Sequence, residues 1–280
     1  MVEIDQIVLH PVKVRRRIDP VGLARLHHMD GYRSDTYGAS FADVYDEWYG
    51  DLDDLDVLIA MLTEFAETGP VCELGVGTGR IAIPLAATGL NVVGIDSSAA
   101  MLQRLSDADP SASVEVVHGD MVDDIPTGPF SLIVIAFNTL FNLNDAGRQA
   151  ACVEHAAARL QPGGRLFIDG IVPEPALAGY GLTIDDVTVR DLSVDRVVLS
   201  VSRHRPADQT AEGQFIEFTE AGGVRLRPWS VRYSTPQQID AMTAAAGLQL
   251  EHRWCDLQRG AFTDEARRHV SVYRKLDTSS

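Results

Sequence analysis

The sequence has little cysteine, almost no lysine and no long apolar run. Its three cysteines, Cys72, Cys152 and Cys255, are widely spaced and form no CxxC pair. This spacing disfavours a disulfide framework and a structural zinc site, so we expect a protein of the reducing cytoplasm. The best apolar run, Phe130 to Phe137, is strand-sized, far short of the ~20 residues that a membrane-spanning helix needs.

Basic residues are also scarce. The 280 residues include 24 Lys and Arg against 40 Asp and Glu, a formal net charge of −16 at pH 7. An acidic surface repels phosphate backbones, so we expect neither nucleic acid nor a membrane as a partner. The 45% hydrophobic content supplies a core large enough for one domain, or for a core domain with a lid.

From Val71 onward, short apolar runs alternate with stretches of helical spacing. The expected strands are Val71–Leu74, Val92–Ile95, Val114–Val117, Ser131–Ala136 and Arg165–Asp169. The expected helices between them are Arg80–Ala87, Ser98–Ser106 and Asp145–Leu160. Alternating strands and helices predict an α/β fold with a doubly wound, mostly parallel sheet.

The flanking segments follow other patterns. Four runs of period two predict an antiparallel β insertion: Val187–Leu192, Arg196–Arg203, Gln214–Phe218 and Val224–Tyr233. Helical spacing is expected over Ala42–Tyr49, Leu52–Phe65 and Thr235–Ala246, and strands over Leu248–Cys255 and His269–Lys275. We expect four parts: an N-terminal extension and lid helix (1–50), a cofactor core (51–180), the β insertion over the active site (181–234), and the last core elements (235–280).

The sharpest local signal is a glycine loop between an expected strand and an expected helix, Glu73-Leu-Gly75-Val-Gly77-Thr-Gly79-Arg80. Glycines let the backbone turn tightly and approach a ligand, and a helix N-terminus presents free N–H groups. A dinucleotide-binding loop reads GxGxxG, whereas this loop reads GxGxG with an acid two residues before its first glycine. An acid there repels a pyrophosphate but favours a ligand that carries an ammonium group.

Three more residues stand at the ends of the following elements. Asp96 ends the next strand, 17 residues after Gly79, where it can accept both hydroxyls of a ribose. Met101 can lie against a purine ring, and Asp120 follows the third strand, where a carboxylate can accept from an adenine amino group. Together they predict a pocket for adenosine linked to an amino acid. Asp96 alone also suits a nicotinamide cofactor, so a dehydrogenase is the rival interpretation of this pocket.

This ordered set, followed by Leu160-Gln-Pro-Gly-Gly-Arg-Leu, resembles class I S-adenosylmethionine (SAM)-dependent methyltransferases. The resemblance implies a seven-stranded Rossmann-like sheet, SAM as cofactor and S-adenosylhomocysteine as product. Ala42-Asp-Val-Tyr45-Asp-Glu-Trp-Tyr49 is similar to the N-terminal helix of bacterial nucleotide-sugar N,N-dimethyltransferases, which methylate the amino group of deoxyaminosugars. Small-molecule O- and C-methyltransferases of actinobacterial secondary metabolism share this architecture, so the substrate does not follow. Residues 1–38 have no counterpart in the family.

The motifs and the resemblance together give the expected cofactor contacts, which lie in the lid, the glycine loop and the strand ends. They are Tyr37, Tyr45, Glu73, Gly75, Gly77, Gly79, Arg80, Asp96, Ser97, Met101, Asp120, Met121 and Phe137. Nothing in the spacing of the histidines suggests a metal site.

Methyl transfer from a sulfonium needs alignment and exclusion of water more than it needs a base, unless the acceptor is a hydroxyl or a carbon acid. The resemblance makes Tyr49 an active-site tyrosine that closes over SAM; its alternative role is packing of the first helix. Asp169, at the carboxyl end of the fifth strand, is a candidate to bind an amine or hydroxyl, or a loop cap. His204, on the polar face of the β insertion, is the candidate base, or a half-exposed strand residue.

Substrate contacts are expected from two places. Asn138 and Phe141 follow the fourth strand, at the ligand-binding edge of the sheet. Arg225 and Arg227 belong to a basic island in an acidic chain, which suits a phosphate or carboxylate; their alternative role is pairing with Glu217 or Glu220.

The sequence thus predicts an enzyme that moves a methyl group from SAM to a nitrogen or oxygen of a small molecule, such as a secondary metabolite. Two alternatives stay open: C-methylation of a small molecule, and a SAM-binding protein of this fold that catalyses a non-methylating reaction. The segment after the fourth strand, Asn138-Thr-Leu-Phe141, lacks the Asn-Pro-Pro-aromatic motif of many nucleic-acid methyltransferases. A lid can close within one subunit or across a homodimer.

Overall fold

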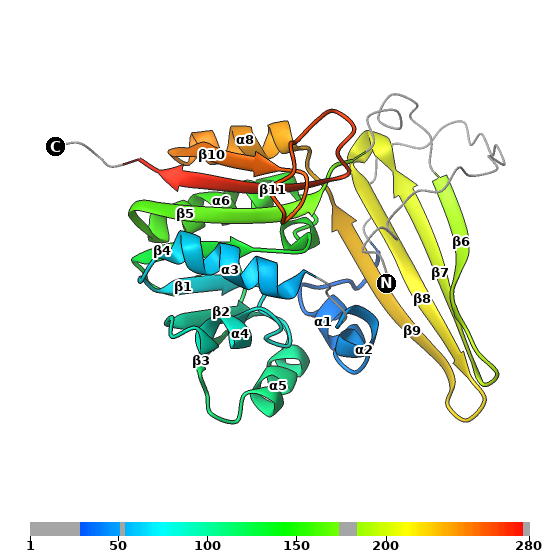
Figure 1. Cartoon of the computed structure of the whole chain (residues 1–280). Coiled ribbons are helices and arrows are strands. Elements are labelled where there is room, and N and C mark those ends of the chain that lie inside the picture. Colours follow the sequence, from blue (N-terminus) through cyan, green and yellow to red (C-terminus); the bar gives the residue numbers. More distant parts are fainter. Residues whose placement is uncertain (1–28, 51–53, 174–183, 277–280) are drawn as a thin grey trace.

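The computed structural model describes residues 29–50, 54–173 and 184–276. They form a seven-stranded sheet and a separate four-stranded sheet, with two short helices between the sheets (Figure 1). The N-terminal extension predicted over residues 1–38 lies outside the described residues up to residue 28. None of the helices in the described ranges is long and apolar enough to cross a membrane.

The large sheet has the strand order β10-β11-β5-β4-β1-β2-β3, in which only the β11 pairings are antiparallel. Its strands are β1 Val71–Leu74, β2 Val92–Asp96, β3 Val114–His118, β4 Phe130–Ile135, β5 Leu160–Ile171, β10 Leu248–Trp254 and β11 Arg268–Lys275. The strands β1 and β4 are buried along their whole length, as expected for a sheet covered on both faces. The predicted doubly wound α/β fold is therefore confirmed.

Five helices cover the two faces of this sheet: α3 Leu55–Ala66, α4 Ala82–Ala87, α5 Ala99–Ala108, α6 Ala146–Arg159 and α8 Pro236–Ala245. Helix α3 buries Leu58, Leu62 and Phe65 at helical spacing against one face. On the other face, α6 and α8 cover the core around Ile133 and Tyr273. Helix α8 begins with a capping box, in which the Thr235 hydroxyl accepts from the Gln238 N–H.

The predicted β insertion is the four-stranded antiparallel sheet β6-β7-β8-β9, called the meander below. Its strands are β6 Ile184–Leu192, β7 Arg196–Arg205, β8 Thr210–Thr219 and β9 Gly223–Arg232. Figure 1 shows the meander beside the carboxyl ends of the parallel strands, with two of its hairpin tips pointing away from the core. It therefore stands at the edge of the large sheet where open α/β sheets bind ligands.

Two short helices, α1 Thr36–Phe41 and α2 Tyr45–Tyr49, lie between the meander and the core and are called the lid helices below (Figure 1). The helix predicted over Ala42–Tyr49 is confirmed for Tyr45–Tyr49 as α2, whereas residues 42–44 form a turn that separates α2 from α1. The turn brings Phe41 within 6.0 Å of Trp48, measured between ring centroids, and both rings pack edge-on against Phe215 of the meander. Burial of these three rings outweighs continuation of one helix.

A buried arginine of β9 fastens the lid helices to the meander. The guanidinium of Arg227 donates to Asp43 at 2.6 and 3.1 Å, to Glu217 at 2.7 Å and to the Ser40 carbonyl at 2.5 Å. Its side chain is only 1% exposed, so the two carboxylates compensate a charge that has left water. Arg225 also pairs with Asp43, at 2.7 Å. Arg227 is thus held within the chain by Asp43 and by the Glu217 named as its alternative partner, whereas Arg225 is 54% exposed and its contact with a substrate stays a prediction.

We expect Asp43→Asn to lower the free energy of unfolding by about 1–3 kcal/mol, because Arg227 stays buried with one carboxylate fewer. Urea denaturation at neutral pH measures this loss. The matched control is Asp185→Asn, which breaks the exposed pair of Asp185 with Arg203 and should cost about 0–1 kcal/mol. Equal losses in the two variants would contradict the role given to Arg227.

Candidate functional site

The glycine loop has the conformation that its sequence predicts. Gly75, Gly77 and Gly79 have φ values of +74°, +57° and +83°, which side chains rarely adopt. A Cβ atom on Gly75 would also lie 2.4 Å from Cγ2 of Thr139. Glycine is therefore required at Gly75 both for the turn and for the close approach of Thr139, which lies in the 3₁₀ helix η2 Thr139–Asn142 after β4.

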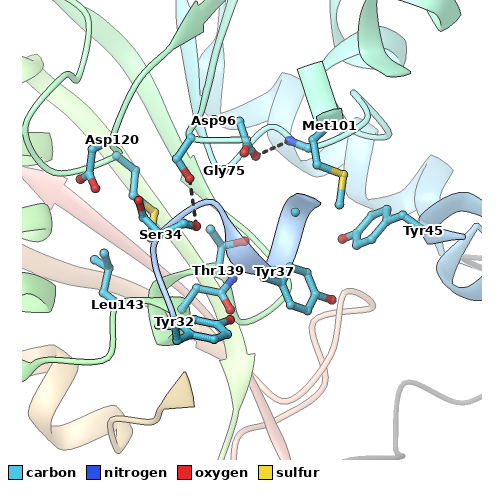
Figure 2. Close-up of a pocket in the computed structure, with 15 residues that line it drawn as sticks. Tyr32, Ser34, Tyr37, Tyr45, Gly75, Asp96, Met101, Asp120, Thr139 and Leu143 are labelled. Atoms are coloured by element: carbon cyan, nitrogen blue, oxygen red, sulfur yellow. Dashed lines mark hydrogen bonds between the residues drawn. The ribbon is translucent and has the colours of Figure 1, made fainter. Parts of the chain in front are cut away.

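Asp96 fixes this loop at the end of β2. One oxygen of its carboxylate accepts from the Gly77 N–H at 2.9 Å and the other accepts from the Ser98 N–H at 2.8 Å. Each oxygen keeps a lone pair, so the carboxylate can still accept from a ligand hydroxyl. Asp96 and both glycines, Gly75 and Gly77, line the pocket in Figure 2.

Glu73 is the penultimate residue of β1, just before the glycine loop, and is 5% exposed. Its Oε2 atom is buried without a hydrogen-bond partner. Burial raises the pKa of this carboxyl to about 8, and Asp96 raises it further while Arg80 opposes the shift. A buried acid with an unpaired oxygen fits a cationic ligand group, which would supply the missing donor.

Arg80 joins the glycine loop to the lid helices. Its guanidinium lies 4.5 Å from the Phe137 ring centroid and 5.4 Å from that of Tyr45, and it donates to the Tyr49 carbonyl. It is thus held by aromatic faces and a backbone oxygen. Tyr49, predicted as catalytic, lies outside the pocket wall and pairs by its hydroxyl with Tyr37, which lines the pocket.

The lid helices and the residues before them close the pocket opposite the glycine loop, where Figure 2 shows Tyr32, Ser34 and Tyr37. The Ser97 hydroxyl donates to the Ser34 carbonyl at 3.0 Å. A Cβ on Gly38 would lie 2.4 Å from the Cβ of Ser98, so the absence of a side chain lets α1 lie directly on the start of α5.

Several other predicted cofactor contacts also line the pocket. Met101, Asp120 and Met121 line the pocket with Ser97. The Asp120 carboxylate already accepts from Arg148 at 2.6 Å and from the Val122 N–H at 2.8 Å. Both of these bonds use Oδ1, and adenine recognition by Asp120 stays a prediction.

Asp169 was predicted to face a ligand at the carboxyl end of β5, but in the structure it is buried and paired. It is 3% exposed, and its two oxygens accept from Arg268 at 2.7 and 2.9 Å. Phe137 and Asn138, which donate from their backbone N–H groups to Asp169, both have positive φ. This geometry assigns Asp169 to holding the loop after β4 and is a correction to its candidate catalytic role.

The other predicted catalytic and substrate-binding residues near this edge of the sheet, Asn138, Phe141 and His204, also have partners within the chain. The Asn138 amide oxygen accepts from the Ile171 N–H at 2.7 Å, and the Phe141 ring is 2% exposed in the core, so Phe141 does not present its side chain to a substrate. His204 is 8% exposed on the inner face of the meander, with Nε2 2.8 Å from the Tyr233 hydroxyl. Burial lowers its pKa, and it is not among the pocket residues. The structure thus places Phe141 and His204 in buried positions outside the pocket wall, which corrects their predicted roles, while a substrate contact of Asn138 stays a prediction.

Sequence reasoning missed part of the pocket wall, namely Tyr32, Ser34, Gly38, Thr139, Asn142 and Leu143. The sequence analysis predicted contacts from other residues of the segment after β4, namely Phe137, Asn138 and Phe141. The position of this segment after a buried strand could therefore also have indicated Thr139, Asn142 and Leu143. Residues 32–38 have no clear period, and their approach to α5 depends on tertiary packing.

Comparison with known proteins identifies the fold and its chemistry. Residues 71–164 match a family described as a methyltransferase domain. The chain is 37% identical to the CcbJ methyltransferase from Streptomyces caelestis, covering 88% of this chain and 100% of that chain with a TM-score of 0.79. Its fold is also like that of SAM-bound CalS10, an amino pentose methyltransferase from Micromonospora echinaspora involved in calicheamicin biosynthesis (20% identity, 89% and 100% coverage, TM-score 0.62).

A curated relative gives a shorter match. The chain is 32% identical to an rRNA adenine N-6-methyltransferase from Corynebacterium diphtheriae over 80 residues, which are 28% of this chain and 30% of that protein.

The pocket fits SAM, which is the cofactor of this chain. The glycine loop allows close approach, and Asp96 keeps acceptor capacity for hydroxyls. Glu73 is not among the described residues that line the pocket, but its buried oxygen lacks a hydrogen-bond partner and suits a cation. The rival interpretation, a dehydrogenase with a nicotinamide cofactor, is therefore wrong. With these residues in place and the match to CcbJ running through the whole of that chain, this protein belongs to the SAM-dependent methyltransferases.

Proposed function

We propose that the enzyme methylates an amine nitrogen of a small molecule by in-line displacement, with oxygen as the second candidate atom. SAM supplies the electrophilic methyl group when it is bound. The chain supplies the rest: the glycine loop and Asp96 hold the cofactor, and the lid helices exclude water and orient the acceptor.

The observation that carries the proposal is the lack of a free base among the described residues that line the pocket, none of which is His or Lys. Its carboxylates, Asp96 and Asp120, already accept N–H groups. Burial raises the pKa of Tyr37, as do Tyr49 and Tyr45, and burial raises that of Tyr45. Both phenols therefore stay protonated at neutral pH. A neutral amine needs no base to attack, whereas a hydroxyl does.

The acceptor class has two supports. CalS10, a relative in fold, is an amino pentose methyltransferase, so this architecture accommodates an amine-bearing small molecule. The net charge of −16 disfavours RNA as the acceptor, although a short segment matches an rRNA methyltransferase.

Isotopically labelled methyl tests the proposal. The purified enzyme is incubated with labelled SAM and matched acceptor pairs, amino sugars or cyclic amines beside the corresponding hydroxyl compounds. We expect label on the amines and little on the hydroxyl analogues. Label on carbon, or tight SAM binding with no transfer to any acceptor, would overturn the proposal and favour C-methylation or a non-methylating reaction.

Glu73 should couple SAM binding to proton release. With a pKa of about 8, its carboxyl is mostly protonated between about pH 6 and 7 in the empty pocket, and a bound cation favours the ionised form. Affinity should therefore rise with pH in this range, and calorimetry in buffers of different ionisation enthalpy should detect the released proton. Glu73→Gln should bind more weakly and release none. An unchanged pH slope in that variant would place the titrating group elsewhere.

Tyr37 and Tyr49, whose hydroxyls pair, should differ in their effect on catalysis because only Tyr37 lines the pocket. We expect Tyr37→Phe to lower kcat more than SAM affinity, because its hydroxyl lines the pocket, and Tyr49→Phe to have the smaller effect, because it acts through Tyr37. Steady-state kinetics with the best acceptor and SAM titration of both variants measure this. A larger loss of kcat in Tyr49→Phe than in Tyr37→Phe would contradict this expectation and support the catalytic role that the sequence predicted for Tyr49.

A further inference from the structure

One arginine of the meander, Arg190, is turned toward the lid helices by an irregularity in the edge strand β6. Val189 pairs with Leu199 of β7 and Asp191 pairs with Val198, so Arg190 is an extra residue between two paired ones. A β-bulge of this kind changes the direction of a side chain and bends the strand. It therefore explains how an arginine of an edge strand reaches the rings of α2.

The guanidinium of Arg190 lies on aromatic rings. Its Cζ atom is 4.6 Å from the ring centroid of Trp48, 5.1 Å from that of Phe215 and 5.2 Å from that of Tyr49. One of its nitrogens also donates to the Trp48 carbonyl at 3.4 Å. Ring faces attract a guanidinium, and its planar shape lets it stack on them, so these contacts help to fix where the rings lie.

Arg190 differs from the two other arginines that lie over the same ring. Arg196 is 5.7 Å and Arg227 is 5.4 Å from the Trp48 ring centroid, and both pair with Glu217. In the part of the chain that the structure describes, Arg190 contacts rings and a carbonyl but has no ion pair with a carboxylate. Its contacts therefore act on the position of the rings rather than on the balance of charge.

Tyr49 continues this contact toward the pocket. Its ring centroid lies 5.2 Å from that of Tyr45, which lines the pocket in Figure 2. The Arg80 guanidinium in turn lies 5.4 Å from the Tyr45 ring and 4.5 Å from the Phe137 ring. Three rings and two guanidinium groups thus form a continuous series of contacts from Arg190 of the meander, through α2, to the loop after β4.

The two arginines of this series hold the C-terminal end of α2 from opposite neighbours. Arg190 donates to the Trp48 carbonyl, and Arg80 of the glycine loop donates to the Tyr49 carbonyl. The last carbonyls of a helix have no donor within it, so both bonds satisfy groups that would otherwise need water. Loss of Arg190 would free the Tyr49 ring on the side of the meander.

We propose that Arg190 is a positioning residue, which holds the Tyr49 ring from the meander and thereby places the pocket tyrosines Tyr45 and Tyr37. The hydroxyl of Tyr49 pairs with that of Tyr37, so a displaced Tyr49 ring disturbs both tyrosines of the pocket wall. Arg190 itself is not among the described residues that line the pocket. The effect expected on catalysis rests on the proposed function, in which the lid helices orient the acceptor.

A double-mutant cycle of Arg190→Ala and Tyr49→Phe tests this role, with whichever acceptor takes the labelled methyl on nitrogen, oxygen or carbon. We expect Arg190→Ala to lower kcat about three- to tenfold and to change SAM affinity less than about twofold, because Arg190 does not line the pocket. In the Tyr49→Phe background Arg190→Ala should lower kcat by a smaller factor, since the hydroxyl that it places is already absent.

The matched control is Arg203→Ala, which removes an exposed meander arginine that pairs with Asp185. It should leave kcat at the wild-type value. The proposal is overturned by wild-type kcat in Arg190→Ala, by effects of Arg190→Ala and Tyr49→Phe that simply multiply, or by an equal loss in the control.

Fluorine NMR tests the placement of the tyrosines without any acceptor. The full chain, made with fluorotyrosine at its 7 tyrosines, gives signals that Tyr→Phe variants assign to Tyr37, Tyr45 and Tyr49. We expect Arg190→Ala to shift these signals and Arg203→Ala to leave them in place. Unshifted signals in Arg190→Ala overturn the proposal. Shifted signals in an enzyme that methylates no tested acceptor support the role of Arg190 and overturn only the proposed function.

A milder variant keeps the test decisive if Arg190→Ala does not fold. Arg190→Lys keeps the positive charge but lacks the planar group that lies on the rings. We expect its kcat to stay below that of the wild type and the same signals to shift. Wild-type kcat together with a wild-type spectrum in Arg190→Lys overturns the proposal.

Discussion

The burial of one arginine determines how this enzyme closes over its cofactor. A guanidinium that leaves water is tolerated only when acceptors surround it, and Arg227 obtains them from two parts of the chain, Glu217 on the meander and Asp43 beside the lid helices. The meander therefore cannot keep this side chain buried without the lid helices against it. Phe41 and Trp48 extend the same contact with apolar area. The pocket wall at Tyr37 and Tyr45 depends on this joint, because both tyrosines belong to the lid helices that it fixes.

The fold was largely predictable because its signals are local. Strands buried on both faces are short apolar runs, so β1 was predicted with its observed bounds, and helical spacing predicted α8. The turn between α1 and α2 was not predictable in this way. Its cause is Phe215, about 170 residues further along the chain, which gathers Phe41 and Trp48 around one ring. Helical spacing alone favours one continuous helix there.

The residues of the site also differ in whether local sequence or distant partners determine their role. Glu73, the three glycines and Asp96 were found because the loop and its neighbouring strand end lie within a short stretch of sequence and have few conformations open to them. Asp169, His204 and Arg227 were misjudged because a side chain's availability depends on its partner. Those partners, Arg268, Tyr233 and Asp43, lie 99, 29 and 184 residues away. The chemical type of a residue at a strand end therefore predicts a functional role less well than a loop whose backbone conformation is determined by its sequence.

The lid helices are bonded unequally to their two neighbours. Toward the meander they have a buried ion pair and packed rings. Toward the cofactor loop they have hydrogen bonds from Arg80 to the Tyr49 carbonyl and from Thr78 to Asp46, while Ser97 holds the Ser34 carbonyl just before them. Water can replace each of those bonds at little cost, but it cannot cheaply replace the contacts of Arg227. The buried charge therefore holds the pocket wall at Tyr37 and Tyr45 from the side of the meander, so we expect the lid helices to stay with the meander when the cofactor leaves.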